Sequence, residues 1–126
     1  MESTVLIVDD SETFLDAARL LLERQGLKVA GVASTSAEAL RQADAIRPDV
    51  VLVDVFLGKE SGFQLARQLV ERNQDRQTTV ILISSYDRQE FEDLLGSSAA
   101  AGFLSKAELS ARAIRLIVER RRQLEG

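Results

Sequence analysis

The sequence predicts one α/β domain, in which helices cover both faces of a five-stranded parallel sheet. Short runs of Val, Ile and Leu alternate with longer amphipathic stretches along the 126 residues. Two of these runs, residues 5–8 and 50–53, are continuously apolar, which is typical of strands buried on both faces. Strands that alternate with helices favour a parallel sheet with right-handed crossovers. We expect the domain to fill residues 1–126, with a core over about 4–122.

The five predicted strands share aliphatic, often β-branched side chains, and each ends at polar residues or at a turn. They cover residues 5–8, 27–33, 50–53, 79–83 and 102–104. No linker, internal repeat or low-complexity segment interrupts the chain, and the predicted connections are short. We therefore expect one domain in which all five strands share a sheet. The polar stretch 73–78 is predicted to be a loop.

Five amphipathic stretches with capping or stop signals predict the helices. They cover about residues 13–25, 35–46, 62–72, 87–95 and 110–122. Thr35 followed by Glu38, and Asp87 followed by Glu90, match the capping-box spacing. Ser110 is expected to cap the last helix. On the first helix, the residues expected to share the core-facing side are Phe14, Ala18, Leu21 and Leu22.

The composition excludes several kinds of chemistry. Histidine and cysteine are both absent, so zinc sites built on these residues and a Ser-His-Asp triad are ruled out. Any chemistry must use carboxylates, hydroxyls, lysine and a bound ion. The net charge of −4 argues against a nucleic-acid-binding domain. No signal peptide is recognisable, and no apolar run approaches the ~20 residues that span a membrane, so a cytoplasmic protein is expected.

Polar residues follow four of the five predicted strands. Asp9 and Asp10 follow the first strand, and Asp54 follows the third. Ser84 follows the fourth strand, and Lys106 follows the fifth. In the flavodoxin-like strand order 2-1-3-4-5, the second strand lies at the edge and the other four are contiguous. The four polar ends would then meet where open α/β sheets bind their ligands.

This combination of side chains suits a phosphoryl group. Three carboxylates at one spot repel each other unless a cation lies between them. Mg²⁺ binds oxygen ligands, often one or two carboxylates together with phosphate oxygens. A hydroxyl and an ammonium can contact the remaining phosphoryl oxygens. Each residue alone would be an ordinary helix cap, turn residue or surface lysine, but together they predict a carboxylate that accepts a phosphoryl group.

The sequence resembles the receiver domain of two-component response regulators. The resemblance covers residues 4 to about 120. It rests on VLIVDD at the first strand, DVFLGKESG from Asp54, VILISS with Ser84, and GFLSK with Lys106. The separations of 30 residues from Asp54 to Ser84, and of 22 from Ser84 to Lys106, are those of the family.

The resemblance implies a phosphoacceptor and a metal site. Asp54 would accept the phosphoryl group from a phosphohistidine on a partner histidine kinase or phosphotransfer protein. Asp10 would bind Mg²⁺ (or Mn²⁺) directly, and Asp9 would help through water. The backbone carbonyl of Phe56 would complete the metal site together with Asp54. The donor histidine belongs to the partner, which fits a chain without histidine.

The resemblance also implies a conformational switch. Ser84 would bond a phosphoryl oxygen and shift on activation, and Lys106 would pair with the phosphoryl group and, before that, with Asp54. Phe103 stands where the family carries its aromatic switch residue. The surface made by the last two helices and the fifth strand would then control binding to a downstream protein or output domain outside this chain. The same surface could pair two copies of the chain.

Four positions depart from the family pattern. Gly58 replaces a proline four residues after the acceptor, which is expected to loosen that loop. Ala107 replaces a proline after a cis bond; because a cis bond before another residue costs ~2.5–4 kcal/mol, we predict a trans Lys106–Ala107 bond. Phe56 and Tyr86 flank the expected path of attacking water, where they would screen the phosphoryl group and lengthen its lifetime.

Two rival functions remain open. The first is a pseudo-receiver that binds partners without using phosphate. The second is a phosphatase that forms an aspartyl phosphate; such enzymes carry an acid two residues after the nucleophile that follows their first strand, whereas position 11 here is Ser. The arginines of the last helix are interpreted as its solvated face, where cations suit the helix dipole, and not as a nucleic-acid patch. In the favoured interpretation the chain catalyses only its own phosphorylation and dephosphorylation.

Overall fold

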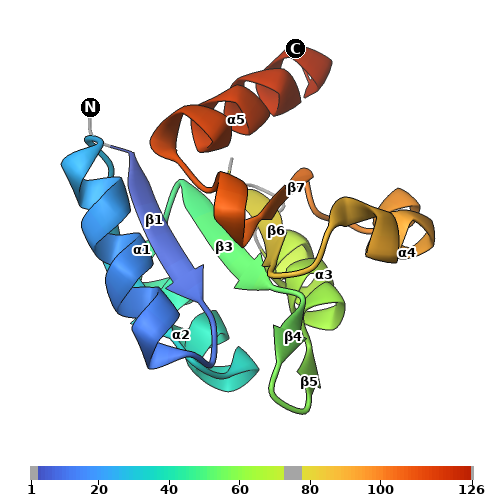
Figure 1. The fold of residues 1–126 in the computed structure, drawn as a ribbon, viewed down its shortest axis with the longest axis horizontal. Coiled ribbons are helices and arrows are strands. Elements are labelled where there is room, and N and C mark those ends of the chain that lie inside the picture. Colours follow the sequence, from blue (N-terminus) through green and yellow to red (C-terminus); the bar gives the residue numbers. More distant parts are fainter. Residues whose placement is uncertain (1–2, 73–77, 126) are drawn as a thin grey trace.

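The computed structural model describes residues 3–72 and 78–125, which form a parallel sheet with helices on both faces (Figure 1). The sheet has the order β2-β1-β3-β6-β7. Its strands are β1 (Thr4–Val8), β2 (Lys28–Ala33), β3 (Val50–Asp54), β6 (Thr79–Ser84) and β7 (Gly102–Ser105). Counted along the chain, these five strands lie in the order 2-1-3-4-5, so the predicted flavodoxin-like fold is confirmed.

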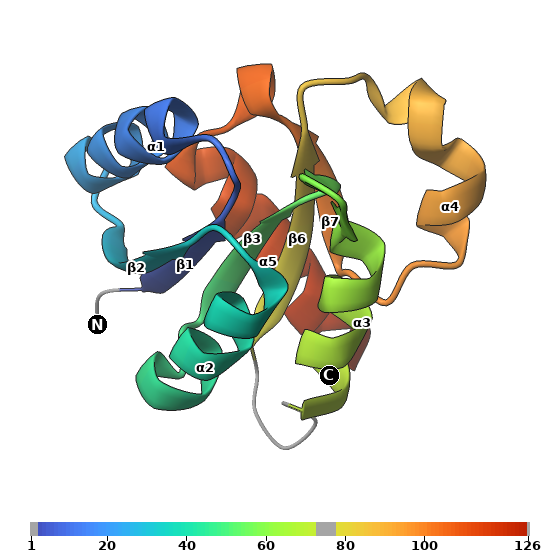
Figure 2. The ribbon, with the colours of Figure 1, turned by 90° about the horizontal axis from the view of Figure 1, so that it is seen from below.

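The helices divide between the two faces of the sheet (Figure 2). They are α1 (Glu12–Arg24), α2 (Ser36–Ile46), α3 (Gly62–Arg72), α4 (Glu92–Gly96) and α5 (Ala111–Glu125). Buried side chains of α1 and α5 pack on one face, and those of α2 and α3 pack on the other. Both sides of the sheet are therefore removed from water.

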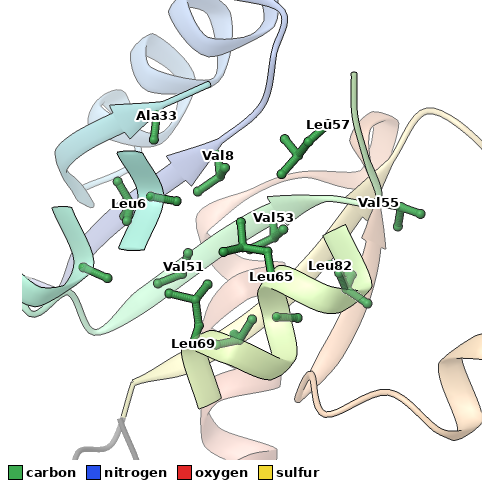
Figure 3. Close-up of a cluster of buried hydrophobic side chains, with 14 of the residues drawn as sticks. Leu6, Val8, Ala33, Val51, Val53, Val55, Leu57, Leu65, Leu69 and Leu82 are labelled. Atoms are coloured by element: carbon green, nitrogen blue, oxygen red, sulfur yellow. The ribbon is translucent and has the colours of Figure 1, made fainter. Parts of the chain in front are cut away.

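The strands are continuously apolar because successive side chains point into different cores. In β1, Val5 and Ile7 join the cluster under α1 and α5, whereas Leu6 and Val8 join the cluster under α2 and α3. Figure 3 shows the second cluster, in which Leu65 and Leu69 of α3 lie over β3. Such two-sided burial is typical of parallel sheets, and it holds the strand ends in a fixed register.

Side-chain caps begin four helices. At the start of α3, Ser61 Oγ accepts a hydrogen bond from Gln64 N at 3.3 Å. Ser11 Oγ accepts a hydrogen bond from Phe14 N at 3.3 Å, at the start of α1. Thr35 Oγ1 accepts from Glu38 N at 3.2 Å, and Ser110 Oγ accepts from Ala113 N at 3.0 Å. The predicted caps at Thr35 and Ser110 are confirmed. Each cap satisfies a backbone N–H that has no partner within its helix.

The predicted core face of α1 was partly wrong. Leu15, Ala18 and Leu22 are the buried residues of this helix. Leu21 is 38% exposed, and Phe14 is half-buried. The reason is the width of the apolar stripe, because Leu15, Ala18 and Leu22 lie at its centre and Phe14 and Leu21 lie at its flank.

The segment predicted as one helix over residues 87–95 is instead divided. A 3₁₀ turn, η1 (Arg88–Phe91), precedes the short α4. The side chain of Asp87 makes no capping hydrogen bond. The turn buries Phe91, whereas α4 buries none of its residues and leaves Leu94 54% exposed. Phe91 is buried and Leu95 only partly buried against the core, so a longer helix here would gain little further burial.

The loop after β3 contains a small antiparallel hairpin, β4 (Phe56–Leu57) and β5 (Glu60–Ser61). Gly58 adopts a φ of +59°, while Lys59 keeps a negative φ. A positive φ at the first of two turn residues is the pattern of a II′ hairpin turn, which favours glycine there. Gly58 therefore supplies the positive φ of a tight turn, which proline cannot adopt, and the expected loosening of the loop stays a prediction.

The connection from β7 to α5 is short. The Lys106–Ala107 peptide bond is trans, as predicted, and a 3₁₀ turn, η2 (Lys106–Glu108), follows at once. The predicted loop at 73–78 falls almost entirely on residues 73–77, which lie outside the described residues. The first position of η2 is Lys106, so the turn brings this side chain to the end of the sheet.

Gly62, at the start of α3, cannot carry a side chain without moving the acceptor strand. A Cβ built there would overlap the carbonyl oxygen of Asp54 and lie 2.8 Å from Val55 Cα. We expect Gly62→Ala to lower the free energy of unfolding by about 2 kcal/mol or more, because backbone atoms cannot yield as a flexible side chain can. Urea denaturation measures this change.

Gly96→Ala provides the matched control for this substitution. A Cβ at Gly96 meets no atom within 4 Å, and alanine favours helix over glycine by about 0.5–1 kcal/mol. The control should therefore be neutral or stabilising. If Gly62→Ala were as well tolerated as Gly96→Ala, the close approach at Asp54 would not constrain the fold.

Candidate functional site

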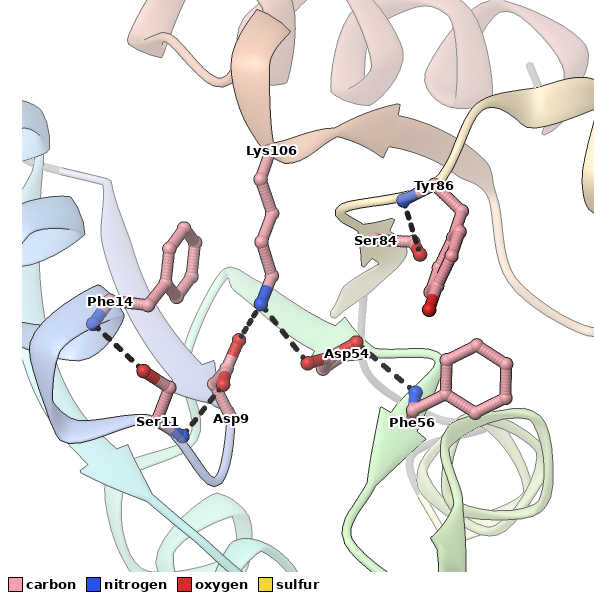
Figure 4. A network of polar contacts seen from close by, with 8 residues as sticks. All are labelled: Asp9, Ser11, Phe14, Asp54, Phe56, Ser84, Tyr86 and Lys106. Atoms are coloured by element: carbon pink, nitrogen blue, oxygen red, sulfur yellow. Dashed lines mark hydrogen bonds and ion pairs between the residues drawn. The ribbon is translucent and has the colours of Figure 1, made fainter.

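Four strand ends bring the predicted site residues together (Figure 4). Asp9 follows β1, Asp54 ends β3, Ser84 ends β6, and Lys106 follows β7. These strands are neighbours in the sheet, in the order β1-β3-β6-β7. The side chains meet there because parallel strands end at one edge.

Asp9 is fully buried and is held at both carboxylate oxygens. Its Oδ1 accepts a hydrogen bond from Ser11 N at 2.8 Å, and its Oδ2 lies 2.6 Å from Lys106 Nζ. A buried carboxylate of this kind requires a cationic partner. Asp10 is exposed to solvent beside it, so the two adjacent aspartates occupy different environments.

Asp54 is 6% exposed and is also held at both oxygens. Its Oδ1 accepts from Phe56 N at 3.1 Å, and its Oδ2 accepts from Lys106 Nζ at 3.1 Å. Burial raises the pKa of Asp54 to about 6, and the charge of Asp9 acts in the same direction against the stabilising contacts of Phe56 and Lys106. The carboxylate is therefore mostly ionised near neutral pH.

Lys106 neutralises two carboxylates at once. Burial alone would lower its pKa, but the hydrogen bonds and charges of Asp9 and Asp54 outweigh burial and hold the pKa above its ordinary value. The ammonium remains charged near neutral pH. Its third neighbour is the ring of Phe14, whose centroid lies 4.2 Å from Nζ.

Ser84 and Phe103 lie on the other side of the acceptor. Ser84 is buried, and its Oγ accepts a hydrogen bond from Tyr86 N at 3.1 Å. Phe103 is also buried, and its ring centroid lies 6.1 Å from that of Phe91. Both residues therefore make their nearest polar or aromatic contacts within the segment that follows β6, and not with Asp54.

Phe56 and Tyr86 form an exposed aromatic pair beside Asp54. Their centroids are 5.8 Å apart in an edge-to-face arrangement. Phe91 lies beneath both rings, 5.7 Å from Phe56 and 6.3 Å from Tyr86. The predicted pair is thus part of a larger aromatic cluster, which also includes Phe63 and Phe103.

Sequence reasoning missed Phe14 and Phe91 as neighbours of the site. Phe14 follows Asp10 by four residues, so the start of a capped helix could have placed it near the strand ends. Phe91 is the only aromatic residue of the 3₁₀ turn after β6. An aromatic residue in an otherwise polar segment is a signal of burial that could have been used.

The acidic residues fit a divalent cation. Asp9, Asp10 and Asp54 each offer a carboxylate oxygen, and the three atoms lie within 4.8 Å of one another. The donors are hard oxygens without sulfur or imidazole, which suits Mg²⁺ or Mn²⁺. The exposure of Asp10 leaves room for water ligands. The role of the Phe56 backbone carbonyl as a further metal ligand stays a prediction.

The response regulator receiver domain family matches this chain over residues 5–119. The chain belongs to this family. The receiver domain spans most of the chain, and the matched range contains all the site residues described above. Receiver domains of response regulators act in two-component signal transduction.

Two curated relatives are longer than the stretch that they share with this chain. The chain is 34% identical over 101 residues to the alkaline phosphatase synthesis transcriptional regulatory protein PhoP of Bacillus subtilis, covering 80% of this chain and 40% of PhoP. It is 33% identical over 118 residues to the response regulator GacA of Pseudomonas viridiflava, covering 90% of this chain and 54% of GacA. The receiver therefore spans about half of the length of these relatives.

Solved receivers share the whole fold. The signal receiver domain of a modulated diguanylate cyclase from Desulfovibrio desulfuricans G20 matches with a TM-score of 0.80 and 28% identity, over 100% of both chains. A response regulator from Thermotoga maritima matches with a TM-score of 0.79 and 26% identity, over 94% of this chain and 99% of that one. In the described parts of this receiver, no helix is both long and apolar enough to cross a bilayer.

The raised pKa of Asp54 predicts that its negative charge lowers the free energy of unfolding at neutral pH. Because the pKa of Asp54 is about 6 in the folded protein, against an ordinary value of 3.8, the folded state binds the proton more tightly, and stability falls as pH rises from about 4 to 6. Asp54→Asn should therefore raise the free energy of unfolding by on the order of 1–2 kcal/mol at pH 7.5 without divalent cations.

The same comparison at low pH provides the control. Near pH 4 both carboxyl and amide are largely neutral in the folded state, so the gain should disappear there. Urea denaturation in EDTA at the two pH values measures both differences. An equal gain at pH 4 and pH 7.5 would show that Asn stabilises through packing or hydrogen bonding and not by removing charge.

Proposed function

We propose that this receiver accepts a phosphoryl group on Asp54 from a phosphohistidine of a partner kinase or phosphotransfer protein. The observation that carries this proposal is the placement of Asp54. Its carboxylate is buried at the end of β3, with the Lys106 ammonium on one oxygen and the carboxylates of Asp9 and Asp10 close by. An ionised carboxylate fixed beside a cation is a nucleophile for phosphoryl transfer.

In the transfer, an oxygen of Asp54 forms the new bond to phosphorus as the bond from phosphorus to the donor nitrogen breaks. The donor imidazole keeps the electron pair of that bond. Asp54 supplies its oxygen without first losing a proton, because its pKa of about 6 leaves it mostly ionised at neutral pH. Lys106 lies 3.1 Å from Oδ2 and can follow the charge onto the phosphoryl oxygens.

A divalent cation held by Asp9, Asp10, Asp54 and the Phe56 carbonyl would offset the charge of the phosphoryl oxygens. The chain itself contributes one further group, the side chain of Ser84. The hydroxyl of Ser84 accepts from Tyr86 N, so its own O–H is available to donate to a phosphoryl oxygen. In this proposal the chain catalyses only its own phosphorylation and dephosphorylation.

The response to phosphorylation would start at Ser84 and reach the surface of α4, β7 and α5. A turn of Ser84 toward the phosphoryl group would disturb its bond with Tyr86 N. Tyr86 and Phe103 both contact the ring of Phe91, so a shift of this segment changes the packing of Phe103 and of α4. Switches of this kind bias two arrangements of a segment. The output would be binding to a downstream protein or to a second copy.

Specific observations weaken the two rival functions. A pseudo-receiver would not need a cationic lysine shared by two buried carboxylates, because burying such charges costs free energy. For the phosphatase, Ser11 stands at the position where an acid would be needed. Its hydroxyl accepts from Phe14 N and caps α1, which is a structural role.

Phosphorylation itself is directly testable by intact mass. After incubation with Mg²⁺ and acetyl phosphate or phosphoramidate, we expect an adduct of about 80 Da, the mass of PO₃H, on the wild-type chain. Asp54→Ala should abolish the adduct. Asp16→Ala, which changes an exposed aspartate of α1, should retain it. An adduct on Asp54→Ala would place the acceptor elsewhere, no adduct on the wild type would favour the pseudo-receiver, and rapid turnover of phosphate esters would favour the phosphatase.

The rings of Phe56 and Tyr86 form an apolar surface beside Asp54 (Figure 4). Phe56 and Tyr86 are 52% and 56% exposed, yet their rings contact each other and both rest on buried Phe91. Rings supported in this way are held in place and exclude water from the space that they cover. We propose that they slow the attack of water on phosphorylated Asp54.

Phe56→Asn should therefore accelerate dephosphorylation, by about tenfold if the ring accounts for ~1.4 kcal/mol of the barrier. The measurement is the decay of the phosphorylated protein after removal of the donor. Leu94→Asn is the matched control, because Leu94 is similarly exposed, at 54%, on α4, and it should decay at the wild-type rate. An unchanged or slower decay in Phe56→Asn would count against water screening.

A further inference from the structure

The ammonium of Lys106 is enclosed by two carboxylates and one aromatic ring (Figure 4). Its Nζ lies 2.6 Å from Asp9 Oδ2 and 3.1 Å from Asp54 Oδ2. The ring centroid of Phe14 lies 4.2 Å from the same atom, with Nζ over the ring. This distance is well inside the ~6 Å over which a ring face attracts a cation. The lysine side chain remains only 18% exposed.

The segment from Asp9 to Phe14 positions both the aromatic ring and one of the two carboxylates that contact Lys106. Ser11 N donates to Asp9 Oδ1 at 2.8 Å, and Ser11 Oγ accepts from Phe14 N at 3.3 Å. The first turn of α1 is thereby tied to the end of β1. Phe14 and Asp9 approach the ammonium from one short segment, while Asp54 approaches it from β3.

The Phe14 ring can restrict the position of the Lys106 ammonium, which ion pairs alone leave variable. The lysine side chain is flexible and its ammonium is strongly hydrated, so ion pairing alone does not fix its position. A ring face adds attraction without adding negative charge to a site that already holds three carboxylates. It also keeps water from one side of the ammonium.

We propose that Phe14 is a positioning residue for phosphoryl transfer, whose ring face holds the Lys106 ammonium against Asp9 and Asp54. The role of the ring in transfer rests on the proposed phosphorylation of Asp54, whereas its hold on the ammonium does not. Phe14 also packs at the edge of the core between α1 and α5. The tests must therefore separate attraction to the cation from packing.

The first test is an NMR measurement on the unphosphorylated protein. The chain has three lysines, Lys28, Lys59 and Lys106, and the first two are exposed, so they serve as internal references. A ring face over the ammonium should shift the Lys106 Hε protons upfield from the other two. Phe14→Leu should abolish this shift, and Phe14→Tyr should retain it. Lys106 protons that coincide with the references in the wild type would overturn the proposal.

The second test is a double-mutant cycle on the rate of phosphorylation by acetyl phosphate. Phe14→Leu keeps an apolar side chain and should slow the reaction about fivefold, within the range of a cation–π contact, while Phe14→Tyr should restore the rate. In a Lys106→Met background, Phe14→Leu should have little further effect. An equal loss in both backgrounds would mean that the ring acts through packing, and the proposal would fail.

Fluorinated phenylalanines at position 14 provide a final control for packing. Adding one, two and three fluorines weakens the attraction of the ring for a cation while changing its size little. The logarithm of the rate should fall steadily with fluorination, together with the upfield shift of Lys106. A rate independent of fluorination would overturn the role in transfer. If the wild type takes no phosphoryl group at all, the proposed function fails, and the NMR shift still decides whether the ring holds the ammonium.

Discussion

The ion pairs of Lys106 with Asp9 and Asp54 are the interaction on which the site depends. Two nearly inaccessible carboxylates end adjacent strands, and without a cation they would repel each other in a poorly solvated place. Lys106 reaches both because β7 and the turn η2 end at the same edge of the sheet. Anything that moves one of the three side chains must change the charge balance of the other two.

The sheet supplies the rigidity that these ion pairs require. Residues of β1 and β3 alternate between two cores, so a shift of either strand by one residue would send each side chain into the opposite core and disrupt the packing of both. Gly62 lets α3 begin directly against the backbone of Asp54, and Gly62 N donates to Val55 O at 2.9 Å. The acceptor is thus fixed by backbone contacts on one side and by Lys106 on the other.

The sequence predicted the parts of this arrangement that follow from strand order. Asp9, Asp54 and Lys106 could be placed together because parallel strands end at a common edge. The core face of α1 was partly misplaced because residues 14, 15, 18, 21 and 22 are all apolar, and the pattern does not show which of them lie at the centre of the stripe. The contact between Phe14 and Lys106 joins elements far apart in the chain, so the local pattern could place Phe14 near the strand ends but could not name its partner.

The aromatic residues divide the surroundings of the acceptor into two apolar walls. The chain has five phenylalanines and one tyrosine, and only Phe14 lies on the side of α1, against the lysine. The remaining five form the connected cluster around Phe91. Phe14 would hold the Lys106 ammonium that assists transfer. The cluster around Phe91 would keep water from phosphorylated Asp54 and would connect Phe56 and Tyr86 with Phe103. Formation, lifetime and readout of an aspartyl phosphate would then depend on separate aromatic contacts, which single substitutions could alter independently.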